Sequence, residues 1–213
     1  MRYFDTRLDM LRYLLPPKAV IAEIGVHQGI FAQQLFCLMP QLLVLIDPFE
    51  GIVPSGNQDG NNVVYADLDK VYQHLSTTIG PLNNIRLHRG YSQDILPMYP
   101  PIFDCVYIDG DHSYEGVKRD LEIAWAKTKP GGYICGHDYE MNNTKTARVY
   151  DFGVKKAVDE FCGTHQVFIC AKGLDGCVSY AIRKPYSTEI GGGGRPPTSS
   201  SSEKDHPPAH PPS

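Results

Sequence analysis

Several predicted strands end in residues that can bind a ligand or take part in chemistry. These positions are Glu23, Asp47, Gly90, Asp109 and the adjacent pair His137 and Asp138. If the strands are parallel, their carboxyl ends lie on one edge of the sheet, so we expect these positions to converge on a single crevice. Carboxylates at such a place accept hydrogen bonds from hydroxyl or ammonium groups and can ligate a cation. The pattern therefore predicts a ligand site.

The segment that begins with Glu23 reads Glu-Ile-Gly-Val-His-Gln-Gly and lies between an apolar run and a stretch with helical spacing. Gly25 and Gly29 would let the backbone approach a ligand closely, because a Cβ is absent. The spacing differs from the G-x-G-x-x-G of dinucleotide enzymes, and the Glu23 carboxylate would repel a pyrophosphate. A ligand with an ammonium group or ribose hydroxyls suits this turn better.

The elements that must position these residues alternate along the chain. Strands are expected over 19–23, 42–46, 85–88, 103–108 and 133–135, followed by an antiparallel hairpin of 166–171 and 177–183. Helices are expected over 6–15, from 30 to near 39, from 64 to before 80, briefly after 92, around 117–125 and around 154–161. This alternation predicts an α/β fold, with a doubly wound, mostly parallel sheet and helices on both faces.

Composition and charge are those of an ordinary globular domain. The chain has 213 residues, 42% of them hydrophobic, and a formal net charge of −4. Without a basic excess to hold a phosphate backbone, nucleic acid is not an expected partner. No apolar run reaches the roughly 20 residues that cross a bilayer, and no signal peptide is evident. We therefore expect a cytoplasmic protein with no membrane partner.

One domain is predicted over residues 1–184. The tail over 185–213 is rich in Gly, Pro and Ser and is expected to be disordered. Two long polar segments, 51–62 and 140–152, are either binding loops or surface insertions. The six cysteines include no C-x-x-C pair, so we expect buried free thiols rather than a zinc site or disulfides.

Over roughly residues 5–184 the chain resembles the class I S-adenosylmethionine-dependent methyltransferases. Within them it is most similar to the small O-methyltransferases grouped with macrocin O-methyltransferase and, more distantly, catechol O-methyltransferase. The matching segments are 23–29, 46–48, 107–114, 130–132, 137–139 and 153–158. Their order and spacing, with the terminal hairpin, make the resemblance specific. It implies a Rossmann-like, seven-stranded sheet.

The resemblance also implies a site for S-adenosylmethionine. Glu23, Gly25 and Gly29 would shape the pocket for its methionyl part, and Asp47 would accept both ribose hydroxyls, as a carboxylate can. Tyr91 and Ser92 stand where the family makes its adenine contacts, and Asp109 would also border the cofactor. The structural alternative for Asp47 is a turn residue before Pro48.

In the metal-dependent branch of the family, the residues that end the fourth and fifth strands hold magnesium. Asp109 and Asp138 match this role, because carboxylate oxygens suit Mg²⁺. His137 departs from the family pattern, in which an acid or amide is more common. An imidazole favours a softer divalent cation such as Mn²⁺, Zn²⁺ or iron, or it faces the substrate instead. The residues leave open whether a metal is required.

His112 stands three residues after Asp109, where the catechol enzymes carry a lysine base. Histidine has an unperturbed pKa near 6.5 and is suited to take a proton from a hydroxyl at neutral pH. The alternatives are that His112 caps the next helix or only positions the substrate. Asp111 would either ligate a metal through water or orient His112.

The predicted function is methyl transfer from S-adenosylmethionine to the hydroxyl of a small molecule such as a sugar or phenol, with His112 and Asp109 as catalytic residues. Rival interpretations are a metal-dependent hydrolase that uses the Asp/His cluster and a non-catalytic cofactor-binding protein. A nicotinamide oxidoreductase shares the sheet but needs a third glycine that is missing here. The acceptor and the oligomeric state are open, and a homodimer would be compatible with the long loops.

Overall fold

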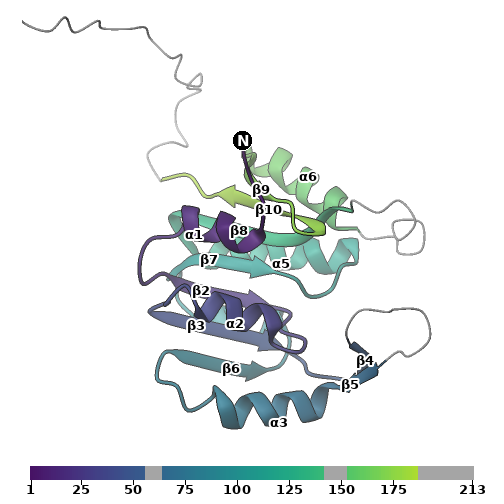
Figure 1. Cartoon of the computed structure of the whole chain (residues 1–213). Coiled ribbons are helices and arrows are strands. Elements are labelled where there is room, and N and C mark those ends of the chain that lie inside the picture. Colours follow the sequence, from purple (N-terminus) through teal and green to yellow (C-terminus); the bar gives the residue numbers. More distant parts are fainter. Residues whose placement is uncertain (56–63, 142–152, 187–213) are drawn as a thin grey trace, which may run out of the picture.

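The computed structural model describes residues 1–55, 64–141 and 153–186. Its strands are β1 (Arg2–Phe4), β2 (Val20–Ile24), β3 (Leu42–Asp47), β4 (Ile52–Ser55), β5 (Val64–Asp67), β6 (Ile85–Arg89), β7 (Phe103–Ile108), β8 (Thr128–Met141), β9 (Ile169–Gly173) and β10 (Cys177–Arg183). Its helices are α1 (Arg7–Leu14), α2 (Ile30–Phe36), α3 (Leu68–Thr78), α4 (Ser92–Ile95), the 3₁₀ turn η1 (Leu96–Met98), α5 (Tyr114–Lys127) and α6 (Val154–His165). Figure 1 shows them as a central sheet with helices on both sides.

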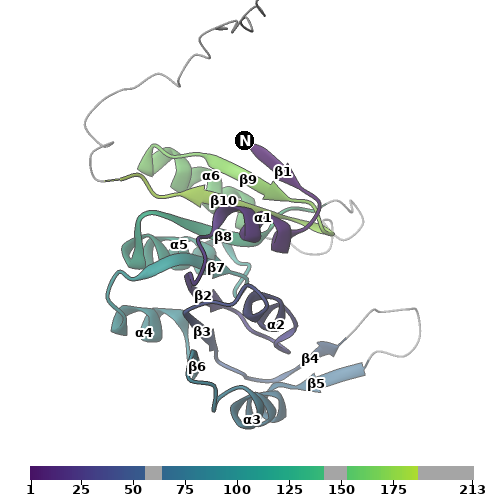
Figure 2. The same cartoon turned by 60° about the vertical axis from the view of Figure 1, so that its left-hand side comes forward.

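The main sheet has the strand order β1-β9-β10-β8-β7-β2-β3-β6 (Figure 2). Only β10 among these strands runs antiparallel to its neighbours, and it pairs with both β8 and β9. The predicted doubly wound sheet and its terminal hairpin are confirmed. The sheet has eight strands instead of seven because Arg2–Phe4 adds a short parallel strand beside β9. Three residues are too few to produce a strand pattern that can be recognised in the sequence.

One predicted helix boundary is wrong. The apolar residues at 64, 68, 71 and 75 suggested a helix from Val64, but Val64–Asp67 pairs with Ile52–Ser55 as a small antiparallel sheet. Helix α3 begins only at Leu68, where the side chain of the N-cap residue Asp67 accepts hydrogen bonds from the backbone N–H groups of Asp69 and Lys70. A single apolar residue one turn before a helix also fits a strand, so periodicity could not place this boundary.

The two faces of the main sheet carry separate cores. Helices α1, α2 and α3 contribute Met10, Leu35 and Leu75 to the core on one face. On the other face, η1, α5 and α6 contribute Leu96, Leu121 and Val158. Strands β2 and β3 are covered on both faces, which explains why their sequences read as continuous apolar runs.

This arrangement gathers the predicted ligand residues at one edge of the sheet. β2 pairs with β3 on one side and with β7 on the other, all three in parallel. The chain order therefore reverses direction at β2, and in such sheets ligands bind beside the carboxyl ends of the strands at this point.

Other expectations concern features around this sheet. All six cysteines are free thiols, as predicted, but only Cys105 and Cys135 are buried, and Cys37 is exposed. Across the described ranges, we find no helix with both the length and the apolar character that crossing a membrane would require. Most of the two predicted loops and nearly all of the predicted tail fall in 56–63, 142–152 and 187–213, outside the described residues.

Candidate active site

A cavity of about 730 Å³ lies at the carboxyl ends of β2, β3 and β7. This volume is within the range of small-molecule and cofactor sites. Its lining includes most of the residues that the sequence singled out, among them Glu23, Gly25, Asp47, Tyr91, Ser92 and Asp109. The predicted convergence of strand ends is therefore present in the structure.

The glycine turn between β2 and α2 depends on left-handed backbone. Gly25 has φ +87°, and a Cβ placed there would collide with the backbone carbonyl of Asp109. Gly29, with φ +77°, is the N-cap of α2. His27 between them also has a positive φ of 52°. A glycine is needed at position 25, where the positive φ and the close approach to the Asp109 backbone leave no room for a side chain. At Gly29 a Cβ would meet the Leu75 side chain at 3.2 Å.

Asp47 fixes the shape of that turn from the end of β3. Its Oδ2 accepts hydrogen bonds from the backbone N–H groups of Val26 and His27, both at 2.9 Å. Its Oδ1 accepts one from Phe49 at 2.6 Å. The carboxylate is therefore a structural acceptor for the turn as well as part of the cavity wall. A carboxylate has about four acceptor positions, so capacity remains for a ligand hydroxyl.

Glu23 is nearly inaccessible, with 1% of its surface exposed. Its Oε2 is buried and has no hydrogen-bond partner among the described residues. Burial, with the nearby charge of Asp109, raises the pKa of Glu23 well above its usual value, and the Arg7 cation partly opposes this. A buried acid with an unused oxygen in a cavity wall is costly unless a ligand supplies a donor.

Residues at the start of α4 and residues of α5 also line the cavity. The Tyr91 hydroxyl donates a hydrogen bond to Glu50 at 3.0 Å. The Ser92 hydroxyl donates one to Asp120, which is 3% exposed. Burial raises the pKa of Asp120 to about 6, although the bond from Ser92 works against this change. The sequence analysis had not identified Asp120 or Glu50.

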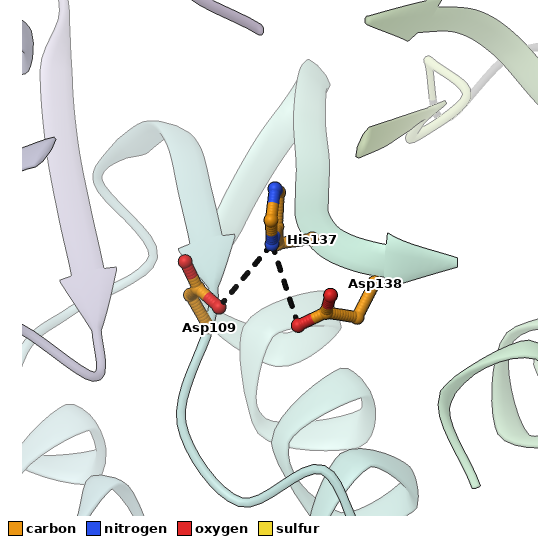
Figure 3. Close-up of side chains that lie close together, drawn as sticks. All are labelled: Asp109, His137 and Asp138. Carbon is orange, nitrogen blue, oxygen red and sulfur yellow. Dashed lines mark ion pairs between the residues drawn. The ribbon is translucent and has the colours of Figure 1, made fainter. Parts of the chain in front are cut away.

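Asp109, His137 and Asp138 form a compact cluster where β7 and β8 pass the cavity (Figure 3). One ligating atom from each lies within 4.8 Å of the others. Nδ1 of His137 is 3.3 Å from Oδ2 of Asp138 and 3.8 Å from Oδ1 of Asp109. Asp138 has a left-handed φ of 56°, and such backbone at a group of ligating side chains is typical of functional sites.

His112 joins this cluster from the segment before α5. Its Nε2 lies 2.9 Å from Oδ2 of Asp138 and 3.4 Å from Oδ1 of Asp109. Burial disfavours the charged imidazole, but the bonds to the two aspartates outweigh it and raise the pKa of His112 to about 10. The same imidazole and that of His137 hold the pKa of Asp138 far below its usual value despite its burial. In this arrangement His112 carries a proton at neutral pH.

The turn before α5 shows which residues cap this helix. Ser113, not His112, is the N-cap of α5, and its side chain accepts a hydrogen bond from Gly116. Asp111 accepts one from the backbone N–H of Ser113 at 2.9 Å and so stabilises the same turn.

The Cys177 thiol donates a hydrogen bond to Asp138. Burial, together with this contact, raises the pKa of Cys177 to about 12. No sequence pattern linked Cys177 to the site.

Arg7 is a further residue of the site that could not be identified from the sequence. It is the first residue of α1, and its Nη1 lies 3.2 Å from Oδ2 of Asp109. The periodicity of this helix indicated only its packing face, and nothing in the sequence linked it to a strand end. Asp120 left a weaker signal, because it lies beside Leu121 and one turn after Val117 on the apolar face of α5.

Comparison with known proteins identifies the family. The family described as "Methyltransferase domain" matches residues 22–139, from the glycine turn to the Asp/His cluster. The chain belongs to this methyltransferase family. With the Rossmann-like fold and the acid and glycine turn at the first buried strand, it is a class I S-adenosylmethionine-dependent methyltransferase.

Solved methyltransferase structures have the same fold. The O-methyltransferase TomG from Streptomyces achromogenes, in complex with S-adenosylmethionine, has a TM-score of 0.55 at 16% identity, covering 84% of this chain and 78% of TomG. The O-methyltransferase NovP has a TM-score of 0.55 at 20% identity, covering 84% and 79%. A putative rRNA-methylase from Clostridium thermocellum has a TM-score of 0.56 at 16% identity, covering 83% and 94%. At these sequence identities, the similarity shows only a shared fold.

A curated relative matches a shorter stretch. The uncharacterized protein R132 of Acanthamoeba polyphaga mimivirus is 35% identical over 63 residues, which are 27% of this chain and 28% of that protein. This match carries no information about substrate.

Proposed function

We propose that this methyltransferase transfers the methyl group of S-adenosylmethionine to a hydroxyl oxygen of a small molecule. The observation that carries the proposal is the cluster of Asp109, His112, His137 and Asp138 beside the cofactor cavity. An oxygen acceptor must lose a proton as it is methylated. Carboxylates and imidazoles at the edge of the cavity can accept that proton directly. They can also bind a metal cation that lowers the pKa of the hydroxyl.

Residues of β2, β3 and α4 would hold the cofactor, which supplies an electrophilic methyl group when bound. Glu23 has a buried oxygen without a partner among the described residues and suits an ammonium donor. Asp47 has acceptor capacity left for a ribose hydroxyl. Gly25 allows the turn to pack against the Asp109 backbone, where a Cβ would collide. Ser92 and Asp120 offer polar groups for the base. Alignment of donor and acceptor can supply roughly 7 to 11 kcal/mol of rate acceleration.

A divalent cation fits the residues at the ends of β7 and β8. Asp109, His137 and Asp138 can each offer one ligand atom, and two of these are carboxylate oxygens. One nitrogen with two oxygens suits Mn²⁺ or Fe²⁺ at least as well as Mg²⁺. Such a cation lowers the pKa of a bound hydroxyl. With both carboxylates committed to it, His112 would lose the partners that raise its pKa and become able to accept a proton.

Charge supports a small acceptor over a nucleic acid. The formal net charge is −4, and Asp109, Asp111 and Asp120 all contribute acidic groups to the cavity lining. Binding of a phosphate backbone depends on lysine and arginine contacts that release counterions. The lining also contains Arg7 and Arg119, so the cavity combines acids with bases and offers no basic surface for a phosphate backbone.

The test is transfer of labelled methyl groups from S-adenosylmethionine to a small-molecule fraction of a cell extract, with total RNA and protein fractions in parallel. We expect label in the small-molecule fraction, as an ether that resists mild base. Added Mn²⁺ or Mg²⁺ should support turnover, and a chelator should suppress it. Label only in RNA or protein would refute the proposal. Turnover insensitive to chelator would refute the metal role alone.

A further inference from the structure

Arg7 places a cation inside the cavity, next to Glu23. Both residues belong to the cavity lining, and 19% of the Arg7 side chain is exposed. The guanidinium carbon lies 4.0 Å above the ring centre of Phe31 in α2. This contact holds the Arg7 side chain next to the helix that follows the glycine turn. Burial and the Asp109 charge raise the pKa of Glu23, and the Arg7 cation lies close enough to oppose part of that rise.

The guanidinium is held in place but not fully used. Nη1 contacts Asp109 at 3.2 Å, Nε is 3.6 Å from Oδ2 of Asp175, and the guanidinium also donates a hydrogen bond to the Tyr107 side chain. The Nε atom is buried and forms no hydrogen bond with any described residue. A guanidinium has five N–H donors in a planar fork that matches a carboxylate. Its backbone N–H also donates to Asp175 at 2.8 Å, so the start of α1 is fixed to the β9–β10 turn.

An acid and a base in the same wall of a cavity are complementary to a zwitterion. Glu23 has an oxygen without a partner among the described residues, and the partly exposed Arg7 side chain lines the same cavity. The methionyl end of S-adenosylmethionine is an α-amino acid, with one ammonium and one carboxylate. We propose that Arg7 binds the carboxylate of this amino acid group, so that Arg7 and Glu23 together select cofactors that carry it. This inference rests on the cofactor site proposed above.

A purely structural role for Arg7 makes a different prediction. If the side chain only ties α1 to Asp109 and Asp175, its loss should loosen the whole cavity and weaken every ligand to a similar extent. The proposed role predicts a loss limited to ligands with the amino acid group. S-Adenosylhomocysteine has this group, whereas 5′-methylthioadenosine has the same nucleoside and thioether without it.

The experiment is calorimetric titration of both compounds into the full chain. For Arg7→Met we expect the Kd for S-adenosylhomocysteine to rise about 10- to 100-fold, because a charge-assisted bidentate contact is lost. The Kd for 5′-methylthioadenosine should change less than threefold. Arg7→Lys keeps the charge without the fork and should recover part of the affinity for S-adenosylhomocysteine. If Arg7→Met does not fold, the Arg7→Lys variant provides the same comparison of the two ligands.

The matched control is Arg12→Met on the same helix. Arg12 is 59% exposed and pairs only with Asp9 among its described neighbours, so both affinities should match the wild type. An unchanged affinity of Arg7→Met for S-adenosylhomocysteine, or an equal loss for both ligands, would overturn the inference alone. Failure of the wild type to bind S-adenosylhomocysteine would overturn the cofactor site as well.

Discussion

The two halves of the cavity are built in different ways. Around the ends of β2 and β3, the shape comes from backbone: the left-handed Gly25 and Gly29 and the N–H groups that donate to Asp47. Around the ends of β7 and β8, it comes from charged side chains that contact one another, with His112 between Asp109 and Asp138. The first half is fixed by sterics and hydrogen bonds. The second depends on which protons or cations are present.

The difference matches what each half has to do. A cofactor that is the same in every turnover is served by a rigid cradle, which costs no reorganisation when the ligand binds. A site that removes a proton has to change its charge, and groups with strongly perturbed pKa values are typical of such sites. Substitutions should therefore act on shape in the first half and on charge in the second.

The largest effect is expected for Gly25→Ala. The new Cβ would collide with the Asp109 carbonyl, and the φ of +87° is itself unfavourable for alanine. We expect a loss of about 3 kcal/mol or more in the free energy of unfolding and no measurable binding of S-adenosylhomocysteine. Chemical denaturation and calorimetry measure the two quantities.

Gly51→Ala is the matched control for backbone strain. Gly51 has a φ of +85°, but a Cβ added there would have no described atom within 4 Å. Only the conformational penalty of about 1 kcal/mol should appear, with cofactor affinity unchanged. Equal effects of the two substitutions would show that close approach to β7 is unimportant.

Asp120 is an exception on the cofactor side, because its charge should matter. Burial raises the pKa of Asp120 to about 6, from 3.8 in an unfolded chain. Its charged form is thus disfavoured in the fold, so stability is highest below the unfolded pKa and falls as pH rises through 6. The loss should be about 2 to 3 kcal/mol between pH 4 and pH 7.

Asp120→Asn should remove this slope. Urea unfolding at pH 4 and pH 7 gives the comparison, in which the wild type should lose more stability than the variant as pH rises. Parallel pH profiles for the two proteins would show that Asp120 is charged in the fold at little cost. The Ser92 hydroxyl can donate to either side chain, so the hydrogen bond itself is kept.

A smaller effect is expected for Asp138→Asn on metal binding. The substitution removes one of the two carboxylates near His137, and the affinity for Mn²⁺ should fall about 10- to 100-fold. Asp69→Asn is the control, because Asp69 is half exposed on α3 and pairs with Arg89. Titration of the metal-free protein with Mn²⁺ measures both. Equal affinities for wild type and Asp138→Asn would exclude a cation at this cluster.

The strand ends could be predicted because a parallel sheet brings the carboxyl ends of its strands together, whatever the loops do. That rule placed Glu23, Asp47 and Asp109 in one cavity. It could not find Arg7, whose contact with Asp109 spans 102 positions of sequence. Nor could it show that Asp47 accepts three backbone N–H groups, because a sequence does not reveal where a turn's donors point. Roles assigned to single residues at the cluster remain predictions.

The most direct test of the cofactor cavity is calorimetric titration of S-adenosylhomocysteine into the wild type and Asp47→Asn. An asparagine amide would face N–H donors that the carboxylate now satisfies, at a cost of about 1 to 3 kcal/mol for each buried donor left unpaired. We predict saturable one-to-one binding by the wild type and at least about tenfold weaker binding by the variant. No saturable binding by the wild type, or equal affinity for the two proteins, would contradict the account.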